Sequence, residues 1–121
     1  MAELPIIPIM YIFANGDLRM NTGKTAAQVG HIVGIIIEEL VRIGYEVNPP
    51  PKQYFDFCKW KRQCTKVILK ATTEQLQELM KMDNARPFYD SGDRLPDNSL
   101  TVVGFFPGTD LTEIVKNYKL I

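Results

Sequence analysis

Residues 9–31 read IMYIFANGDLRMNTGKTAAQVGH and pass from an apolar run, through a polar loop, into a segment with helical periodicity. The apolar residues 9–14 end at an Asn-Gly pair, a pattern that predicts a buried strand. An Asn-Thr pair at positions 21 and 22 can cap the helix that follows, which is predicted to run to about residue 43 and stop at Gly44. A strand followed by a long helix is the building unit of an α/β fold.

This helix is predicted to carry three polar groups on one stripe. Lys24, Gln28 and His31 stand at i, i+4 and i+7. The residues expected to face the core from the other side are Val29, Val33, Ile36, Ile37 and Leu40. An amine, an amide and an imidazole are therefore expected side by side on the outer side of the helix, which makes a candidate site. Ala26 and Ala27 are predicted to let the helix pack closely on the sheet.

The rest of the chain alternates between helices and strands. Thr72 with Gln75, and Asp110 with Glu113, are predicted to form capping boxes at helix starts. The predicted elements are a helix at 52–62, a strand at 65–71, a helix at 72–82, strands at 86–90 and 100–106, and a C-terminal helix. This order predicts a single α/β domain over residues 1–121, with three layers and a four-stranded, mostly parallel mixed sheet with helices on both faces. The third and fourth strands, joined by a loop, are expected to be antiparallel.

Composition excludes several classes of protein. The chain has 121 residues, 45% of them apolar, and no net charge, so nothing global indicates a nucleic-acid or membrane protein. The charge is uneven, because residues 42–70 carry seven basic and two acidic residues. A single His and no CxxC pair argue against zinc, and neither a metal nor another cofactor is predicted. With no signal-peptide pattern and no apolar run of membrane length, a reduced, soluble, cytoplasmic protein is expected.

The residue types at two predicted strand ends suit hydrolysis. Sites in open α/β sheets gather at the carboxyl ends of the strands, so Asp90, which ends the third strand, is expected near Lys24 and His31. A carboxylate or an imidazole can activate water, and an ammonium can stabilise an oxyanion or bind phosphate, as ester or amide hydrolysis requires. A phosphate-binding loop of NTPases is rejected, because Leu18 stands where the first glycine of GxxxxGK[ST] belongs.

Residues 17–31 resemble the signature of the type 2 peptidyl-tRNA hydrolases, roughly D-L-x-M-x-x-G-K-x-A-A-Q-x-x-H-A. The chain departs from it at Ile32, where the family usually has alanine. The matching positions are Asp17, Leu18, Met20, Gly23, Lys24, Ala26, Ala27, Gln28 and His31. Weaker similarities follow in the family's order over nearly the whole chain: Trp60, residues 66–70, 90–92, 101–104, 107–108 and 120–121.

The resemblance implies an enzyme that cleaves the ester joining a peptide to the 3′ ribose of tRNA, without a metal, and so recycles tRNA. The family's functional residues carry over to Lys24, Gln28, His31, Asp90 and Thr101. Lys24 and Asp90 are expected nearest the chemistry, with His31 as a base or a positioning group, and the identity of the general base stays open. The family binds tRNA on a basic face, for which the candidates here are Arg19, Lys59, Lys61, Arg62 and Lys66.

One departure keeps a second hypothesis open. After its Asp-Ala-Gly the family has a basic residue and then Thr-Gln, whereas this chain has Asp93, Arg94 and Leu95. The alternative is therefore a catalytically impaired RNA- or protein-binding module with the same fold. A third reading, a general small-ester hydrolase, predicts cleavage without the tRNA moiety. Apolar surface on the long helix or a sheet edge would allow a homodimer.

Overall fold

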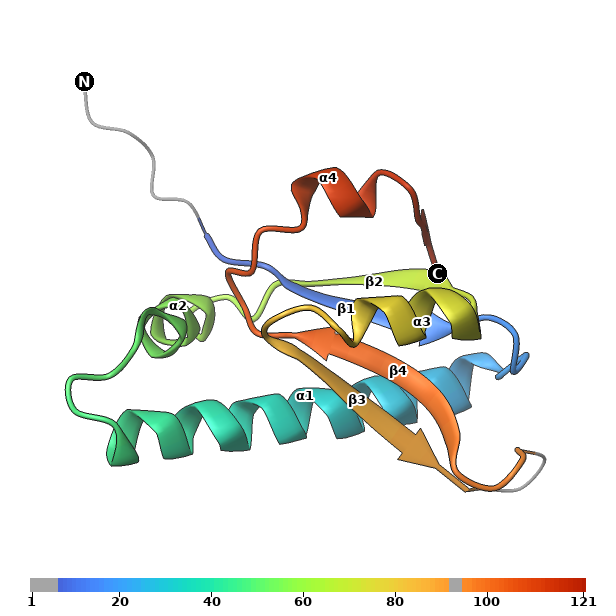
Figure 1. Cartoon of the computed structure of the whole chain (residues 1–121), viewed down its shortest axis with the longest axis horizontal. Helices are drawn as coiled ribbons and strands as arrows, with labels where there is room; N and C mark the ends of the chain where they lie inside the picture. The colour runs from blue at the N-terminus through green and yellow to red at the C-terminus, as the bar shows by residue number, and fades with distance from the viewer. Residues whose placement is uncertain (1–6, 92–94) are drawn as a thin grey trace.

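A mixed five-stranded sheet carries helices on both faces in the computed structural model (Figure 1), which describes residues 7–91 and 95–121. The strands lie in the order β3-β4-β1-β2-β5. Their bounds are β1 Met10–Asn15, β2 Lys66–Ala71, β3 Ala85–Asp90, β4 Ser99–Phe105 and β5 Lys119–Leu120. Helices α1 (Thr22–Glu46) and α2 (Lys52–Trp60) cover one face, and α3 (Thr73–Leu79) and α4 (Thr112–Val115) cover the other. The α/β class and the mixed sheet are confirmed.

The predicted majority of parallel strand pairs was wrong. Only β1 and β2 pair in parallel among the described strands, while β1–β4, β3–β4 and β2–β5 are antiparallel. The helical connections do orient β1, β2 and β3 alike, but β4 enters between β1 and β3 in the opposite direction. The fifth strand was not predicted, because two residues are too short to show an alternating pattern.

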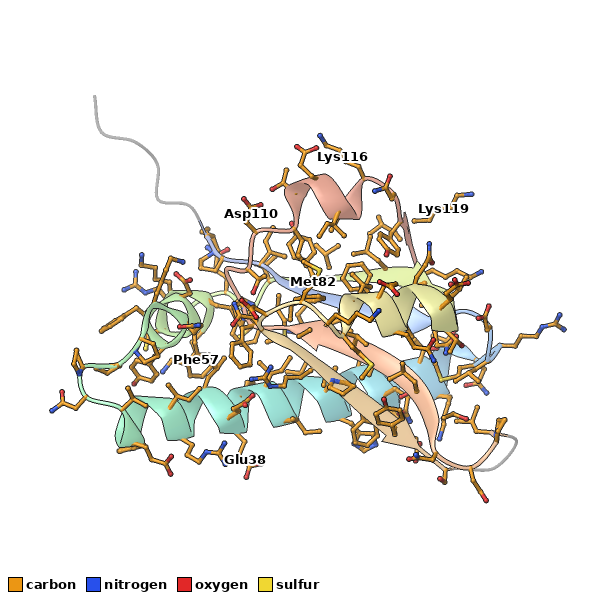
Figure 2. The ribbon with its side chains drawn as sticks, in the orientation of Figure 1. Glu38, Phe57, Met82, Asp110, Lys116 and Lys119 are labelled. Carbon is orange, nitrogen blue, oxygen red and sulfur yellow. The ribbon has the colours of Figure 1, made fainter. Side chains whose placement is uncertain are left out.

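Alternating side chains of β1 divide the core into two layers. Met10, Ile12 and Ala14 are buried beneath α1 and α2, whereas Phe13 is buried on the side of α3 and α4. Figure 2 shows Phe57 of α2 directed toward α1. Burial on both faces explains why residues 9–14 form an unbroken apolar run.

The long helix begins where predicted and ends later. The side chain of Asn21 accepts a hydrogen bond from the Lys24 backbone N–H (2.7 Å), which caps the first turn of α1. The helix does not stop at Gly44, where the Tyr54 ring lies so close that a Cβ would come within 2.1 Å of it. This glycine therefore allows α2 to approach α1, and the stop predicted from it was wrong.

The two predicted capping boxes have different outcomes. Thr72 and Gln75 form the box at the start of α3, as predicted. The box predicted at Asp110 and Glu113 was wrong. Leu111 is the N-cap of α4, and the Asp110 carboxylate instead accepts hydrogen bonds from the backbone N–H and hydroxyl of Thr112.

A bulge in β4 turns one more polar side chain toward α1. Phe88 pairs with Val102 and Tyr89 pairs with Leu100, so Thr101 is an extra residue between two pairs. At a bulge the alternation of side chains is interrupted. Thr101 and Val102 consequently both face α1, the first by a hydrogen bond to that helix and the second within the apolar layer beneath it.

Gly104 of β4 sets how closely α1 can lie on the sheet. A Cβ at this position would lie 2.9 Å from both Ile32 Cγ1 and Ile36 Cδ1. Gly104→Ala is therefore expected to lower the free energy of unfolding by about 1–3 kcal/mol through overpacking. Urea denaturation measures the change. Gly34→Ala is the matched control, because no atom lies within 4 Å of its Cβ position, and it is expected to stabilise the helix. Equal effects of the two substitutions would contradict the packing argument.

Candidate functional site

An ion pair joins the first turns of α1 to the end of β3. Lys24 Nζ lies 2.7 Å from Asp90 Oδ2, and the side chains are 30% and 26% exposed. Lys24 sits at the helix N-terminus, where the helix dipole disfavours a cation, and the carboxylate offsets this unfavourable position. The two residues predicted to lie nearest to the chemistry are thus in direct contact.

Asp90 is held in its ionised form. Its Oδ2 also accepts a hydrogen bond from Gln28 Nε2 (2.7 Å), and its Oδ1 accepts one from the Ser91 backbone N–H (2.8 Å). The hydrogen bonds from Lys24 and Gln28, helped by the positive charge of Lys24 and by the Ser91 N–H, lower the pKa of Asp90 below its ordinary value, although partial burial opposes this shift. The carboxylate is therefore charged at neutral pH.

Gln28 is buried and its orientation is fixed from the sheet. The side chain is 1% exposed, and its Oε1 accepts a hydrogen bond from the fully buried Thr101 hydroxyl (2.7 Å). The ionised Asp90 carboxylate only accepts hydrogen bonds, so the NH₂ end of the amide faces it and the carbonyl end faces the Thr101 hydroxyl. The expectation that Gln28 would lie on the outer side of the helix was wrong: it lies on the buried side, where β4 supplies a partner that helical periodicity cannot reveal.

His31 lies beside the cluster without a hydrogen bond to it. Its ring stacks on that of Phe88, with centroids 4.8 Å apart and an interplanar angle of 22°. Phe88 precedes Asp90 by two residues on β3, so the imidazole and the carboxylate share one side of the strand. None of the hydrogen bonds between described residues involves the exposed His31 side chain, which leaves both ring nitrogens accessible.

The last residue of β1 and a residue of the loop after it tie the site to α3. Asn15 is buried, and its Nδ2 donates to the Leu100 carbonyl and to Thr73 Oγ1 (2.8 Å each). Asp17 accepts a hydrogen bond from the Thr73 backbone N–H through Oδ2. From the Asn-Gly pair, only the end of the strand is predicted at this position. A polar residue that ends an otherwise apolar strand was the available signal, because a buried polar side chain needs partners.

The predicted tRNA-binding residues fall into two places. Arg19 lies in the loop before α1, at the same end of the strands as the site. Lys59, Lys61, Arg62 and Lys66 instead lie at or near the start of β2, where Met10 pairs with Lys66, whereas the site is at the far end of the strands. The length of a six-residue strand, roughly 17 Å, separates them from Lys24 and Asp90. Lys61 and Lys66 lie over the rings of Phe57 and Trp60.

The described parts of the chain show neither a cluster of metal ligands nor a membrane-spanning helix. In residues 7–91 and 95–121, no group of three or more His, Cys, Asp or Glu side chains is arranged to hold a metal ion. No helix in the same ranges has the length and apolar character needed to cross a membrane. The loop in which the sequence departs from the family pattern lies largely outside these ranges, because Asp93 and Arg94 are not described.

Comparison with known protein families finds a match over nearly the whole chain. The family model described as peptidyl-tRNA hydrolase PTH2 matches residues 9–121. The chain belongs to the PTH2 family. No curated protein sequence matches it. Family membership confirms the resemblance seen in the sequence, while the roles of the individual side chains stay predictions.

The buried hydrogen bond between Thr101 and Gln28 makes a testable contribution to stability. Thr101→Val removes the hydroxyl but keeps the shape, and so leaves Gln28 Oε1 buried without a donor. The free energy of unfolding is expected to fall by about 1–3 kcal/mol in urea denaturation. Thr101→Ser keeps the hydroxyl and should lose less. If valine were tolerated as well as serine, the hydrogen bond would not hold Gln28 in place.

The lowered pKa of Asp90 predicts a pH dependence of stability. A carboxyl group with a depressed pKa in the folded state stabilises the fold above its unfolded-state pKa of about 3.9, and this stabilisation is lost as the pH falls through the folded-state pKa. Asp90→Asn should therefore lower the free energy of unfolding near neutral pH, and the difference from the parent chain should shrink below about pH 4. Urea denaturation at a series of pH values measures this. A difference independent of pH would contradict it.

Proposed function

We propose that this chain hydrolyses the ester bond between the peptide and the 3′ ribose of peptidyl-tRNA, releasing free tRNA. The observation that carries the proposal is the cluster of Lys24, Asp90, Gln28 and Thr101, joined by hydrogen bonds of 2.7 Å, in a member of the PTH2 family. Family membership supports peptidyl-tRNA hydrolysis in general, and the cluster offers the groups that an ester hydrolase needs.

Lys24 is assigned to the developing oxyanion. An ammonium group has three N–H donors, of which one is directed at Asp90 Oδ2. The other two can donate to the ester carbonyl oxygen as it becomes negatively charged. Asp90 holds the ammonium in place, and Gln28, fixed by Thr101, keeps the carboxylate in place. Gln28 and Thr101 are thus positioning residues in this proposal.

Asp90 also has an acceptor site for the attacking water. Its Oδ2 accepts from Lys24 and Gln28, whereas its Oδ1 accepts only the Ser91 N–H among the described donors. A carboxylate oxygen has two lone pairs, so Oδ1 can hold one water molecule. Because the pKa of Asp90 is lowered, the carboxylate is a weak base, and orienting the water suits it better than removing its proton.

His31 is assigned as the proton acceptor. Imidazole is the commonest general base, and this ring lies on the same side of β3 as Asp90. In the proposed step, the water oxygen bonds to the carbonyl carbon and its proton passes to His31. The bond from that carbon to the ribose 3′ oxygen then breaks, and the 3′ oxygen takes the proton back. The products are a peptide with a free carboxylate and a tRNA with a free 3′ hydroxyl.

Substitutions of the ion pair test this proposal. Lys24→Ala and Asp90→Ala are each expected to reduce kcat for tRNA release from N-acetylaminoacyl-tRNA by at least about tenfold, or roughly 1.4 kcal/mol of transition-state stabilisation. Lys81→Gln, on the other face of the sheet, is the control, because its ammonium pairs only with Glu78 at the surface. Circular dichroism verifies that each variant is folded.

The same assay separates the alternatives. Full turnover by folded Lys24→Ala and Asp90→Ala proteins would refute the site. A parent chain that binds the substrate and does not cleave it would be the impaired binding module. Equal cleavage of a small acyl ester, with no dependence on salt, would indicate a general esterase, since phosphate contacts make tRNA binding weaken with salt.

A further inference from the structure

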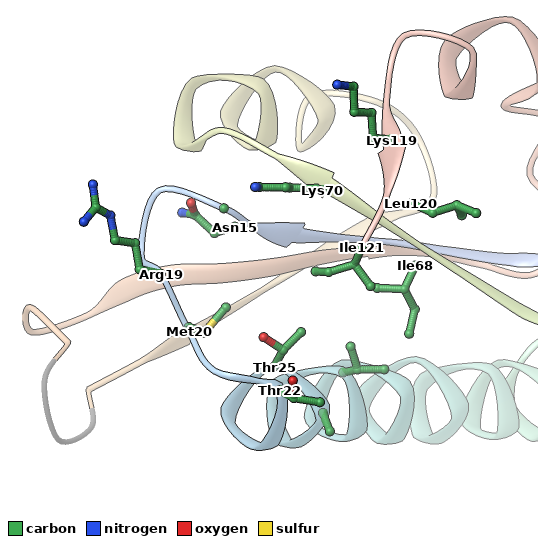
Figure 3. A pocket seen from close by; sticks show the side chains of 13 residues that line it. Asn15, Arg19, Met20, Thr22, Thr25, Ile68, Lys70, Lys119, Leu120 and Ile121 are labelled. Atoms are coloured by element: carbon green, nitrogen blue, oxygen red, sulfur yellow. The ribbon is translucent and has the colours of Figure 1, made fainter.

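A cleft of about 790 Å³ opens on the other flank of α1 from the ion pair (Figure 3). It lies between the first turns of the helix, the β1–α1 loop and the edge formed by β2 and β5. Thr25 and Ala26 border the cleft, whereas Lys24, the residue before Thr25, forms the ion pair on the opposite flank. Ala26 and Ala27 are both exposed, so the prediction that they let the helix pack closely on the sheet was wrong.

Three cations surround the cleft: Arg19, Lys70 and Lys119. None of them forms an ion pair with a described residue, whereas Lys24 on the opposite flank is neutralised by Asp90. None of the side chains that line the cleft is acidic. The cleft therefore has an excess of positive charge, although the whole chain has no net charge.

Two of these cations are held together at a cost to stability. Lys70 and Lys119 are direct partners in the antiparallel pairing of β2 with β5. Like charges directly opposite each other on neighbouring strands are destabilising. A bound anion between the two ammonium groups would remove the repulsion, so this pairing itself points to an anionic ligand.

Arg19 is held in a backbone conformation that its side chain does not favour. Its φ is 51°, in the left-handed region where residues other than Gly, Asn and Asp are uncommon. Such conformations cost free energy and gather at functional sites. Figure 3 shows Arg19 at the rim of the cleft, projecting outward where an incoming ligand would meet it.

The interior of the cleft is apolar, and it continues past the two lysines. Ile68, Leu120 and Ile121 line it on the side of the sheet. A second hollow, of about 440 Å³, shares Lys70 and Lys119 with it and extends toward α3. Two hollows with cations between them suit two consecutive nucleotides whose linking phosphate lies at the lysines. One base would lie on the apolar interior of the first hollow, and the other beside Tyr118 in the second, which Asp17 and Asn117 also line. Each hollow is within the size range of small-ligand sites, ~300–1,000 Å³.

We propose that this cleft binds the single-stranded 3′ end of the tRNA acceptor strand. The inference rests on the proposed function, in which the ester lies at Lys24 and Asp90. The cleft and the ion pair flank the same helical turns, one helix diameter of about 10 Å apart. This is the span between a phosphate near the 3′ end and a reacting ester on the last ribose. A neutral peptide would leave the three cations unpaired, so the cleft takes the nucleotide side of the ester.

The test uses the trinucleotide CCA with a 5′ phosphate, which has no ester to cleave. In a titration followed by ¹H–¹⁵N NMR, the backbone signals of Gly16, Ala26 and Leu120 are expected to shift. Arg19→Asn, Lys70→Gln and Lys119→Gln should each weaken binding about fivefold or more. Each should also make the slope of log affinity against log salt less negative by about 0.7, the value for one single-strand phosphate contact.

Stability distinguishes a binding role from a structural one. Arg19→Asn introduces a residue that tolerates a positive φ, and Lys119→Gln removes the repulsion between like charges. Both variants should therefore keep or raise the free energy of unfolding, although they weaken binding. With peptidyl-tRNA, the same variants should raise KM with little change in kcat. Lys81→Gln, outside both hollows, should bind like the parent chain.

Three outcomes would overturn the proposal: unchanged affinity in the three cleft variants, signal shifts confined to residues 59–66, or adenosine monophosphate binding as tightly as the trinucleotide. The cleft proposal and the proposed function can fail separately. A chain that binds CCA in the cleft but releases no tRNA refutes only the hydrolase function. A chain that releases tRNA with an unchanged KM in all three variants refutes only the cleft.

Discussion

The hydrogen bond from Thr101 to Gln28 is the contact on which the arrangement of the site depends. Both side chains are buried, and each has few alternative partners beneath α1. The hydroxyl donates to the carbonyl end of the amide while the NH₂ end donates to Asp90, so the carboxylate receives a donor from the protein interior in addition to Lys24. An ion pair on a flexible lysine alone would be weak at a partly exposed position. The buried amide gives it a fixed partner.

That contact in turn requires an irregularity in the sheet. In a regular strand Thr101 and Val102 would point to opposite faces. The bulge opposite Phe88 and Tyr89 turns both toward α1, so that one supplies the hydroxyl and the other fills the apolar layer. Gly104, two residues beyond Val102, lets the helix lie close enough for the hydrogen bond to form. The site thus depends on backbone geometry in β4 as much as on the residues that would meet a substrate.

Much of this site could be predicted from the sequence, for a physical reason. The strands that end at Asn15 and Asp90 run in the same direction, so their carboxyl ends share one edge of the sheet even though β4 lies between them. The prediction that Lys24 lies close to Asp90 is therefore correct, although the predicted strand pairing was wrong. The burial of Gln28 could not be predicted, since the bulge that provides its partner depends on the register of β3 with β4. The short strand β5 shows no periodic pattern, so it could not be predicted. The cationic cleft could not be predicted either, because β5 brings Lys119 to it.

The two flanks of the first turns of α1 differ in whether their cations have acidic partners. The chemistry of the proposed reaction explains this difference. On one flank the cation Lys24 is compensated by Asp90, so the proposed reacting group would meet a preorganised pair whose net charge is near zero. On the other flank Arg19, Lys70 and Lys119 have no acidic partner among the described residues.

An ester hydrolase for a polyanion needs both unpaired positive charge and a charge-compensated reaction site. Strong positive charge attracts and holds the phosphates, while the reacting carbonyl is neutral in the ground state and needs donors fixed for the oxyanion that forms later. In the proposed function, placing the two on opposite sides of one helix would keep the phosphates of the substrate away from Lys24, so that its remaining N–H groups would stay available for the transition state.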